Sequence, residues 1–437
     1  MGKLQRWAVR SVRGFWLIPV LCVLGSVALA EGLVAFDEHV VQGSGLTARF
    51  DPIFQIGVDG SRGLLSAIGG SVFGSAATAF SITISVIATT STNYGPRLVG
   101  NFMSDRRNQW TLGVLVSTFV YTTLVLRHLR TLQDGSVFVP HIAVYGAIVL
   151  AIVDVFLLIS FIHNIASSTQ VETLVATVSA SLRGTVKGRQ REVSGELPAS
   201  SPPHGGELVR AWSDGYVTAL DEQALRQGAL QEEARIAMEV RVGDHVVEGS
   251  PLARIWQGDG RGDPRETVWA AVDLADRRDT ADDMRVAIEH LVELAVRAIS
   301  PGTNDPYTAV TAIDELSGPL GVMMRGRAPA QVLGDDNGVP RVWLRPTPIE
   351  ELIALPFDQV LPYAGGQGLV LEALVGLARH LEQQNTHPEL EGVAWAHVER
   401  VRALAREDGK VDETRVESRI ARAAELLALG TAHRDAD

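Results

Sequence analysis

Hydroxyl side chains recur along one face of a long apolar segment. They are Ser71, Ser75, Thr78, Ser85 and Thr89, with Thr92 one step further. Steps of three, four and seven residues keep side chains on one stripe of a helix. Such a stripe could line a pore in a homo-oligomer, where hydroxyls replace part of an ion's hydration shell. Close packing between membrane helices is the simpler interpretation, because a hydroxyl can bond to a carbonyl one turn back.

Asp154 is the one acidic residue deep inside an apolar segment. A charge at the centre of a bilayer costs about 2.5–3.5 kcal/mol on insertion scales, so such residues face a partner or a wet cavity. No basic residue lies at matching depth, and the candidate partners are Tyr121, Thr122, Thr123 and the hydroxyl stripe. A proton or cation site and a satisfied polar anchor both remain open interpretations.

The most distinctive polar string is Ser300-Pro-Gly-Thr-Asn-Asp-Pro-Tyr-Thr-Ala309. Asp305 is predicted to cap a helix whose first position is Pro306. The string is therefore typical of a tight corner between two helices. The functional alternative is a small-ligand or cation contact through Asn304, Asp305 and Tyr307.

Catalytic patterns are missing from the sequence. There is no GxSxG string, no phosphate-cradling glycine loop and no HExxH motif, and Cys22 is the single cysteine. One cysteine allows neither an intrachain disulfide nor a cysteine-based metal site. We therefore expect no enzymatic activity, no catalytic residues, no metal and no cofactor.

Charge divides the 437 residues into two parts. Residues 1–170 are apolar with a balance of +3, whereas residues 171–437 carry −15 and account for the net charge of −12. This division excludes a single soluble domain, a disordered chain and a wholly embedded transporter. A nucleic-acid partner is not expected, since the acidic polar part would repel phosphate.

The first part contains four apolar segments of the length that crosses a bilayer, about 20 helical residues. They are Phe15–Val34, Leu64–Ser91, Trp110–Arg127 and Phe138–His163. Basic residues precede the first segment and lie between the second and third. Because positive residues stay on the cytoplasmic side, both termini are expected in the cytoplasm, in a multi-pass protein of a plasma membrane.

A cleaved signal peptide is an alternative for the first segment, since Ala28-Leu29-Ala30 resembles a signal-peptidase site. The length of the apolar run and its aromatic start, Phe15-Trp16, argue against cleavage. Cleavage would leave the orientation of the other three segments unchanged.

The expected fold is an α-helical membrane domain followed by a cytoplasmic α+β region. Its divisions are a four-helix transmembrane domain (1–170), a helical extension and flexible linker (171–206), a small β-rich module (207–272) and a mainly helical domain (273–437). The strings GYVTALD and RVGDHVVEGSPLARI resemble the small barrel-like β-sandwich of biotinyl and lipoyl carriers. In such a carrier, biotin or lipoate is attached to a lysine of the domain. Residues 188–409 contain no lysine, so a structural or binding role is expected for this module instead.

Three longer strings resemble one known family. They are residues 80–127, residues 138–166 and AVRAISPGTNDPYTA at 295–309. They are similar to bacterial predicted membrane proteins catalogued as domain of unknown function 2254, and the likeness covers about residues 10–430. The resemblance implies an integral membrane protein of the bacterial plasma (inner) membrane with a cytoplasmic C-terminal region, and it implies no catalytic residues.

Two functions follow from these patterns as hypotheses. The first is a homo-oligomeric ion channel or small-solute pathway in the lipid bilayer, with cytoplasmic domains that gate or assemble it. The second is a membrane-anchored scaffold or sensor that binds a cytoplasmic protein partner.

Overall fold

The computed structural model describes residues 17–41, 57–94, 106–131, 137–168, 171–189, 194–258, 260, 262–278 and 283–434. The chain divides into two compact units, Met1–Gln170 and Val171–Asp437. The basic residues before the first apolar segment lie outside the described residues. Each unit is considered by itself below.

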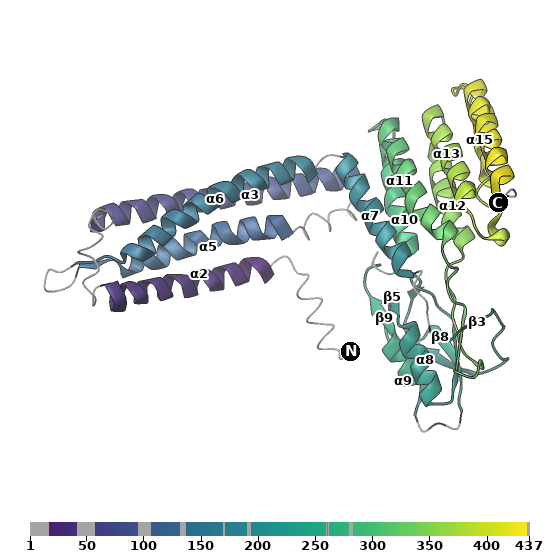
Figure 1. Cartoon of the computed structure of the whole chain (residues 1–437), viewed down its shortest axis with the longest axis horizontal. Helices are drawn as coiled ribbons and strands as arrows, with labels where there is room; N and C mark the ends of the chain where they lie inside the picture. The colour runs from purple at the N-terminus through teal and green to yellow at the C-terminus, as the bar shows by residue number, and fades with distance from the viewer. Residues whose placement is uncertain are drawn as a thin grey trace. The chain divides into compact units, whose positions relative to one another are not determined.

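The first unit consists of four long helices that lie side by side (Figure 1). They are α2 (Leu17–Phe36), α3 (Val58–Tyr94), α5 (Arg106–His128) and α6 (His141–Ser168). All four are long and apolar enough to cross a membrane. The four predicted membrane segments are therefore confirmed as helices.

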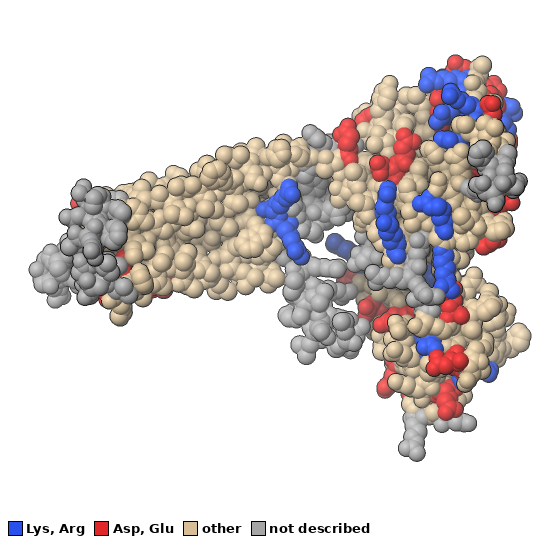
Figure 2. All heavy atoms as spheres, in the orientation of Figure 1, with Lys and Arg blue, Asp and Glu red and all other residues tan. Residues whose placement is uncertain are grey.

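Helix α5 is the inner helix of this unit and packs against α2, α3 and α6. Its membrane-length window is 56% buried, against 17–22% for the other three helices. Apolar side chains on those three face outward, and their surface is almost free of charge (Figure 2). Because α5 is shielded from lipid, it can carry polar residues that the outer helices could expose only at a cost.

A carboxylate supports the start of α6. Helix α2 continues into a short π-helix, η1 (Asp37–Val41), which places Asp37 beside the first turn of α6. Its two oxygens accept hydrogen bonds from the backbone N–H groups of Ile142 and Ala143, at 3.3 and 3.1 Å. A negative group at a helix N-terminus satisfies free N–H groups and complements the helix dipole. Strands β1 (Arg130–Thr131) and β2 (Val137–Phe138) pair between α5 and α6.

The second unit contains a row of helices in which α7, α11, α13 and α15 are successive neighbours (Figure 1). The helices of the unit's helical part are α7 (Val171–Arg189), α10 (Met284–Ala298), α11 (Pro306–Arg325), α12 (Ile349–Val360), α13 (Gly368–Gln384), α14 (Ala396–Asp408) and α15 (Glu413–Arg434). Short 3-10 turns, η3 (Leu361–Tyr363) and η4 (Pro388–Leu390), follow α12 and α13. One face of α10 is apolar and buried, and it includes Ile288, Leu291, Val292 and Ala295.

The β region of the second unit has two sheets. The strands are β3 (Glu196–Leu197), β4 (Glu207–Arg210), β5 (Gly215–Leu220), β6 (Arg235–Met238), β7 (His245–Val246), β8 (Pro251–Trp256), β9 (Val272–Ala275), β10 (Val332–Gly334) and β11 (Pro340–Trp343). One sheet has the order β3-β10-β11-β6-β8-β4 and the other β7-β5-β9. Helices α8 (Glu222–Gln231) and α9 (Pro264–Ala271) pack together beside them.

The carrier-like sandwich is not confirmed. The larger sheet is mixed, because β11 pairs with β6 in parallel while its other strand pairs are antiparallel. The hairpin β10–β11, which turns at residues 335–338, lies within the expected helical domain (273–437) but pairs with this sheet. The β region therefore extends beyond the expected boundaries of 207–272. Leu333 and Val342 of the hairpin complete its core together with Ile236 and Ile255.

Candidate functional site

Asp154 lies at the middle of α6, with a side chain only 3% exposed. Its carboxylate approaches the hydroxyl of Thr118 on α5, but neither carboxylate oxygen completes a hydrogen bond. Thr118 is fully buried, and its hydroxyl also lacks a completed hydrogen bond. The two side chains form a buried polar pair whose hydrogen-bonding capacity is unsatisfied.

Other buried serine and threonine hydroxyls of α5 are satisfied within their own helix. Thr111, Ser117 and Thr122 each donate to a backbone carbonyl three or four residues earlier, at 2.8–3.0 Å. Hydroxyls in membrane helices commonly bond in this way. Thr118 differs from them, because its hydroxyl makes no such bond and stays available to Asp154.

The Asp154–Thr118 pair lies between two apolar clusters. Toward the end of α5 the first cluster contains Tyr121, Val125, Ala143 and Ala147. Toward the start of α5 the second contains Leu112, Leu115, Phe161 and Ile165. The pair is thus enclosed along the seam between α5 and α6 in both directions.

A second polar contact lies on the same seam, ten residues from the pair along each helix. Asn164 of α6 donates through Nδ2 to Oδ1 of Asn108 on α5 at 3.2 Å, and Arg107 approaches Oδ1 of Asn164 at 3.5 Å. At a rise of about 1.5 Å per residue, this contact is about 15 Å from Asp154. The α5–α6 seam therefore has polar positions at its centre and near the start of α5, with apolar side chains between them. Toward the end of α5, the Tyr121 hydroxyl also donates across the seam to the backbone carbonyl of Ala143, at 2.7 Å.

The arrangement at Asp154 can hold a proton or a small cation. An isolated ionised carboxylate in an apolar interior is costly, so a proton or a cation must accompany it. No lysine or arginine lies in the central turns of the four described helices. The available ligands are carboxylate and hydroxyl oxygens, which suit hard cations as well as protons.

The structure separates the hydroxyl stripe from Asp154. Ser71, Thr78, Ser85 and Thr89 are exposed on the outer face of α3, and Ser75 is half-buried. Ser75, Thr78 and Thr89 donate to the carbonyl four residues earlier, at 2.9–3.0 Å. Within one chain the stripe therefore encloses nothing, and its role as a pore lining stays a prediction about an oligomer.

The string at 300–309 forms the predicted corner between α10 and α11. Asp305 caps α11 by accepting from the backbone N–H of Thr308 at 3.1 Å, and Pro306 is the first helical residue. Hydrogen bonds from the hydroxyl and backbone N–H of Thr308 hold the pKa of Asp305 below its usual value. This carboxylate is therefore already engaged in the cap, as the corner interpretation expects.

The other two candidate residues of this string lie at the surface. Asn304 has a left-handed backbone with φ of 49°, and its Oδ1 accepts from Nε2 of Gln367 at 3.3 Å. Tyr307 is 73% exposed. Tyr363, the last residue of η3, is also exposed. It is four residues before Gln367 in the sequence. A ligand contact through Asn304 and Tyr307 stays a prediction.

Thr118 and Asp37 are the polar residues that sequence reasoning missed. Thr118 is at the midpoint of α5, and Asp154 is at the midpoint of α6. Because the midpoints of two antiparallel helices lie side by side, the sequence could have predicted the contact between Thr118 and Asp154. No sequence pattern predicted the contact of Asp37, since only the fold shows that the end of α2 reaches the start of α6. Within the described ranges, no three histidine, cysteine, aspartate or glutamate side chains gather as a possible metal site.

Comparison with known proteins gives relatives without an assigned function. Uncharacterized proteins of Mycobacterium tuberculosis and Mycobacterium bovis are 28% identical over 386 residues, which cover 85% of this chain and 72% of each relative. No solved structure matches the chain. The family model for predicted membrane protein (DUF2254) matches residues 13–380, which confirms the resemblance found in the sequence. The chain therefore belongs to this family of predicted membrane proteins.

Proposed function

We propose that this protein is a homo-oligomeric pathway for a small cation or proton across the bacterial plasma membrane, with Asp154 as its ion-binding carboxyl. The single observation that carries the proposal is the carboxylate itself, buried at mid-depth with both oxygens unsatisfied. Ionisable residues in membrane helices are costly, and they mark ion pathways and proton relays. An anchor that only stabilised the bundle would be expected to complete its hydrogen bonds.

The apolar clusters on both sides of Asp154 make this conformation a closed one. Leu115 and Phe161 pack toward the start of α5, and Tyr121 and Val125 pack toward its end. An ion that reaches Asp154 requires one of these clusters to open. The proposal therefore includes a second conformation in which the α5–α6 seam is wetted from one side.

The outer face of α3 supports assembly of several copies. Gly70 and Gly74 are four residues apart, and a Cβ at either position would meet no atom within 4 Å. Ser71 and Thr78 extend this face of small side chains, and all of them point away from the chain's own bundle. Small residues at this spacing let helices of neighbouring copies approach closely. In such an assembly the hydroxyl stripe would face another copy instead of lipid.

The test is ion flux in liposomes that contain the purified full chain. Entrapped pH-sensitive and sodium- or potassium-sensitive dyes would report flux under imposed gradients. We expect flux in wild type and at least a tenfold loss in Asp154→Asn, which removes the ionisable group and keeps its shape. Thr123→Val is the matched control, because Thr123 is exposed on α5 and bonds to Phe119 of its own helix. No flux of any of these ions, or equal flux in Asp154→Asn, would refute the proposal.

A membrane-anchored scaffold is the second candidate function. It is favoured by the exposed side chains of Tyr307, in the first turn of α11, and Tyr363, at the end of η3. The Asn304–Gln367 hydrogen bond joins the segments next to these two residues. Exposed aromatic residues are enriched in protein interfaces. If this role is correct, the variant Tyr307→Ala/Tyr363→Ala loses a specific protein that co-purifies with wild type, while Asp154→Asn retains it.

A further inference from the structure

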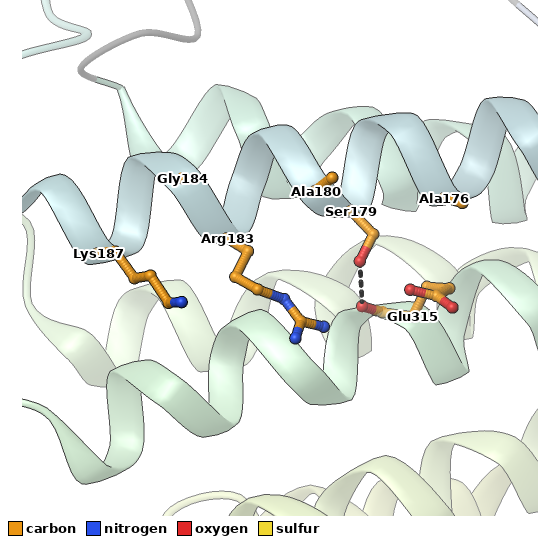
Figure 3. A pocket seen from close by; sticks show the side chains of 7 residues that line it. All are labelled: Ala176, Ser179, Ala180, Arg183, Gly184, Lys187 and Glu315. Atoms are coloured by element: carbon orange, nitrogen blue, oxygen red, sulfur yellow. Dashed lines mark hydrogen bonds between the residues drawn. The ribbon is translucent and has the colours of Figure 1, made fainter.

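We propose that a groove between α7 and α11 binds a phosphate group through Arg183 and Lys187. The groove has a volume of about 330 Å³, at the lower end of the range for ligand sites. Small side chains on successive turns of α7, at Ala176, Ala180 and Gly184, leave it open (Figure 3). This site is independent of the proposed ion pathway.

The walls of the groove are held firmly in place. One face of α7 is buried against α10 and α11, and it includes Leu174, Val178 and Leu182. Ser179 anchors the same face, because its hydroxyl donates to the backbone carbonyl of Glu315 at 3.1 Å. The groove is therefore a fixed feature of the second unit, since both of its walls are packed helices.

Two cations project from α7 at one end of the groove (Figure 3). Arg183 reaches α11, where its guanidinium lies so close to Gly318 that a Cβ there would be 2.5 Å from Nη2. Lys187 follows one turn later on the same side of α7. Glu315 is the acidic residue of the lining, and its side chain points away from Arg183 (Figure 3).

Neither cation is paired with an acidic side chain of the described residues. Arg183 and Lys187 form no ion pair there, whereas arginines elsewhere in the second unit, such as Arg278, Arg285 and Arg327, do. Like charges at positions i and i+4 repel each other, which an anion between them would relieve. A planar guanidinium and an ammonium are the side chains that recognise phosphate oxygens, the first as a fork and the second as a point charge.

The groove lies close in the sequence to the last membrane-length helix. Helix α7 begins at Val171, directly after the last membrane-length helix ends at Ser168. Arg183 is 12 residues into α7, which corresponds to about 18 Å at 1.5 Å per residue. The phosphate of an anionic lipid headgroup and a soluble phosphate offer the same chemistry to such a site, so the experiment must separate these two sources.

The experiment uses the purified full chain and two double variants. Arg183→Gln/Lys187→Gln removes the groove cations, while Lys410→Gln/Arg422→Gln removes one lysine and one arginine that are exposed elsewhere in the unit. Retained phosphatidylglycerol is counted by native mass spectrometry after exchange from phosphatidylglycerol or phosphatidylcholine vesicles. Inorganic phosphate is titrated in a separate arm, with the shift in melting temperature as the readout.

We expect phosphatidylglycerol or inorganic phosphate to bind the groove variant at least about tenfold more weakly than it binds wild type or the control variant. A tenfold loss of affinity corresponds to the loss of one charge-assisted hydrogen bond. An effect in the vesicle arm alone identifies a lipid headgroup, and an effect in the phosphate arm identifies a soluble ligand. Ala180→Trp, which fills the groove without changing its charge, should match the groove variant. Equal binding by wild type and the groove variant in both arms, or an equal loss in the control, would overturn the proposal.

Discussion

Asp154→Asn should make the membrane unit more stable while it lowers ion flux at least tenfold. The carboxylate is 3% exposed and both oxygens lack hydrogen bonds, so the native fold carries the cost of an unsatisfied buried group. That cost is about 1–3 kcal/mol. The amide has nearly the same shape, carries no charge and can both donate to and accept from Thr118. Most of the cost should therefore be recovered as free energy of unfolding.

A gain of this size should be visible as a rise in melting temperature. For a unit of 150–250 residues, each kcal/mol corresponds to about 2–4 °C. Cys22 gives a specific probe, because it is the single cysteine and lies on α2, where a Cβ at Gly113 of α5 would approach its sulfur to 3.1 Å. A thiol-reactive dye added during a thermal ramp of the detergent-solubilised chain therefore labels Cys22 as the membrane helices separate.

The refuting result is a variant that melts at or below the wild-type temperature. That outcome would mean that Asp154 already contributes to stability through its surroundings, as an anchor does. Thr118→Val should lower the melting temperature, because it removes the hydroxyl that lies next to the Asp154 carboxylate. The two variants should therefore shift the melting temperature in opposite directions. Thr78→Val on the exposed face of α3 should leave the melting temperature of the solubilised chain unchanged.

Three further predictions concern positions outside this pair. Asp305→Ala should lower the free energy of unfolding of the second unit by about 1 kcal/mol, the usual value of a lost helix cap, and Asp305→Asn should restore most of it in urea denaturation. Gly146→Ala should lower the Cys22-labelling temperature, because its Cβ would lie 2.5 Å from the Tyr121 hydroxyl oxygen, whereas Gly32→Ala on α2, where a Cβ meets no atom within 4 Å, should not. Burial acts to raise the pKa of Glu351, but bonds and charges from its two arginine partners outweigh this and hold that pKa below its ordinary value. Glu351→Gln should therefore cost about 1 kcal/mol at neutral pH, and the difference from wild type in urea denaturation should disappear as the pH falls through the lowered pKa.

The membrane helices were predictable because lipid imposes a single rule on the sequence. A spanning helix needs about 20 apolar residues, whatever its neighbours are. The four segments could therefore be read from hydropathy, and Asp154 stood out as an exception within one of them. The order of packing could not be read in this way. Helix α5, the inner helix, is the least apolar of the four because of its polar residues, but this property alone does not show which helices surround it.

The direction in which the hydroxyl stripe faces was also beyond the sequence. Period and spacing show that Ser71, Thr78 and Ser85 share one face of a helix, but they do not show what covers that face. The structure buries the opposite side of α3, with Leu65, Val72 and Ala76 against its neighbours. Both faces contain small residues, so either one could have been the packed one.

In the β region, local signals were reliable and long-range pairing was not. The residues at 335–338, Asp-Asp-Asn-Gly, are a local signal for the hairpin β10–β11, since turn chemistry depends on neighbouring residues. Its parallel pairing with β6 joins segments about 100 residues apart, and no local pattern encodes such a partner. Helices α9, α10 and α11 lie between β6 and β11 in the sequence, which is why a separate helical domain was expected. The hairpin instead returns to the sheet, where Val342 pairs with Ile236.

Asp154 and the hydroxyl stripe make two different claims about where ions would pass. A pathway at Asp154 runs along the α5–α6 seam inside each chain, whereas a stripe-lined pore would run between chains on the outer face of α3. Thr78→Val changes the outer face and leaves the seam intact, and Asp154→Asn does the reverse. Flux lost only in Asp154→Asn would place the pathway within the chain and leave the stripe as a packing surface. Flux lost only in Thr78→Val would remove Asp154 from the mechanism, because the buried seam could not then be the route.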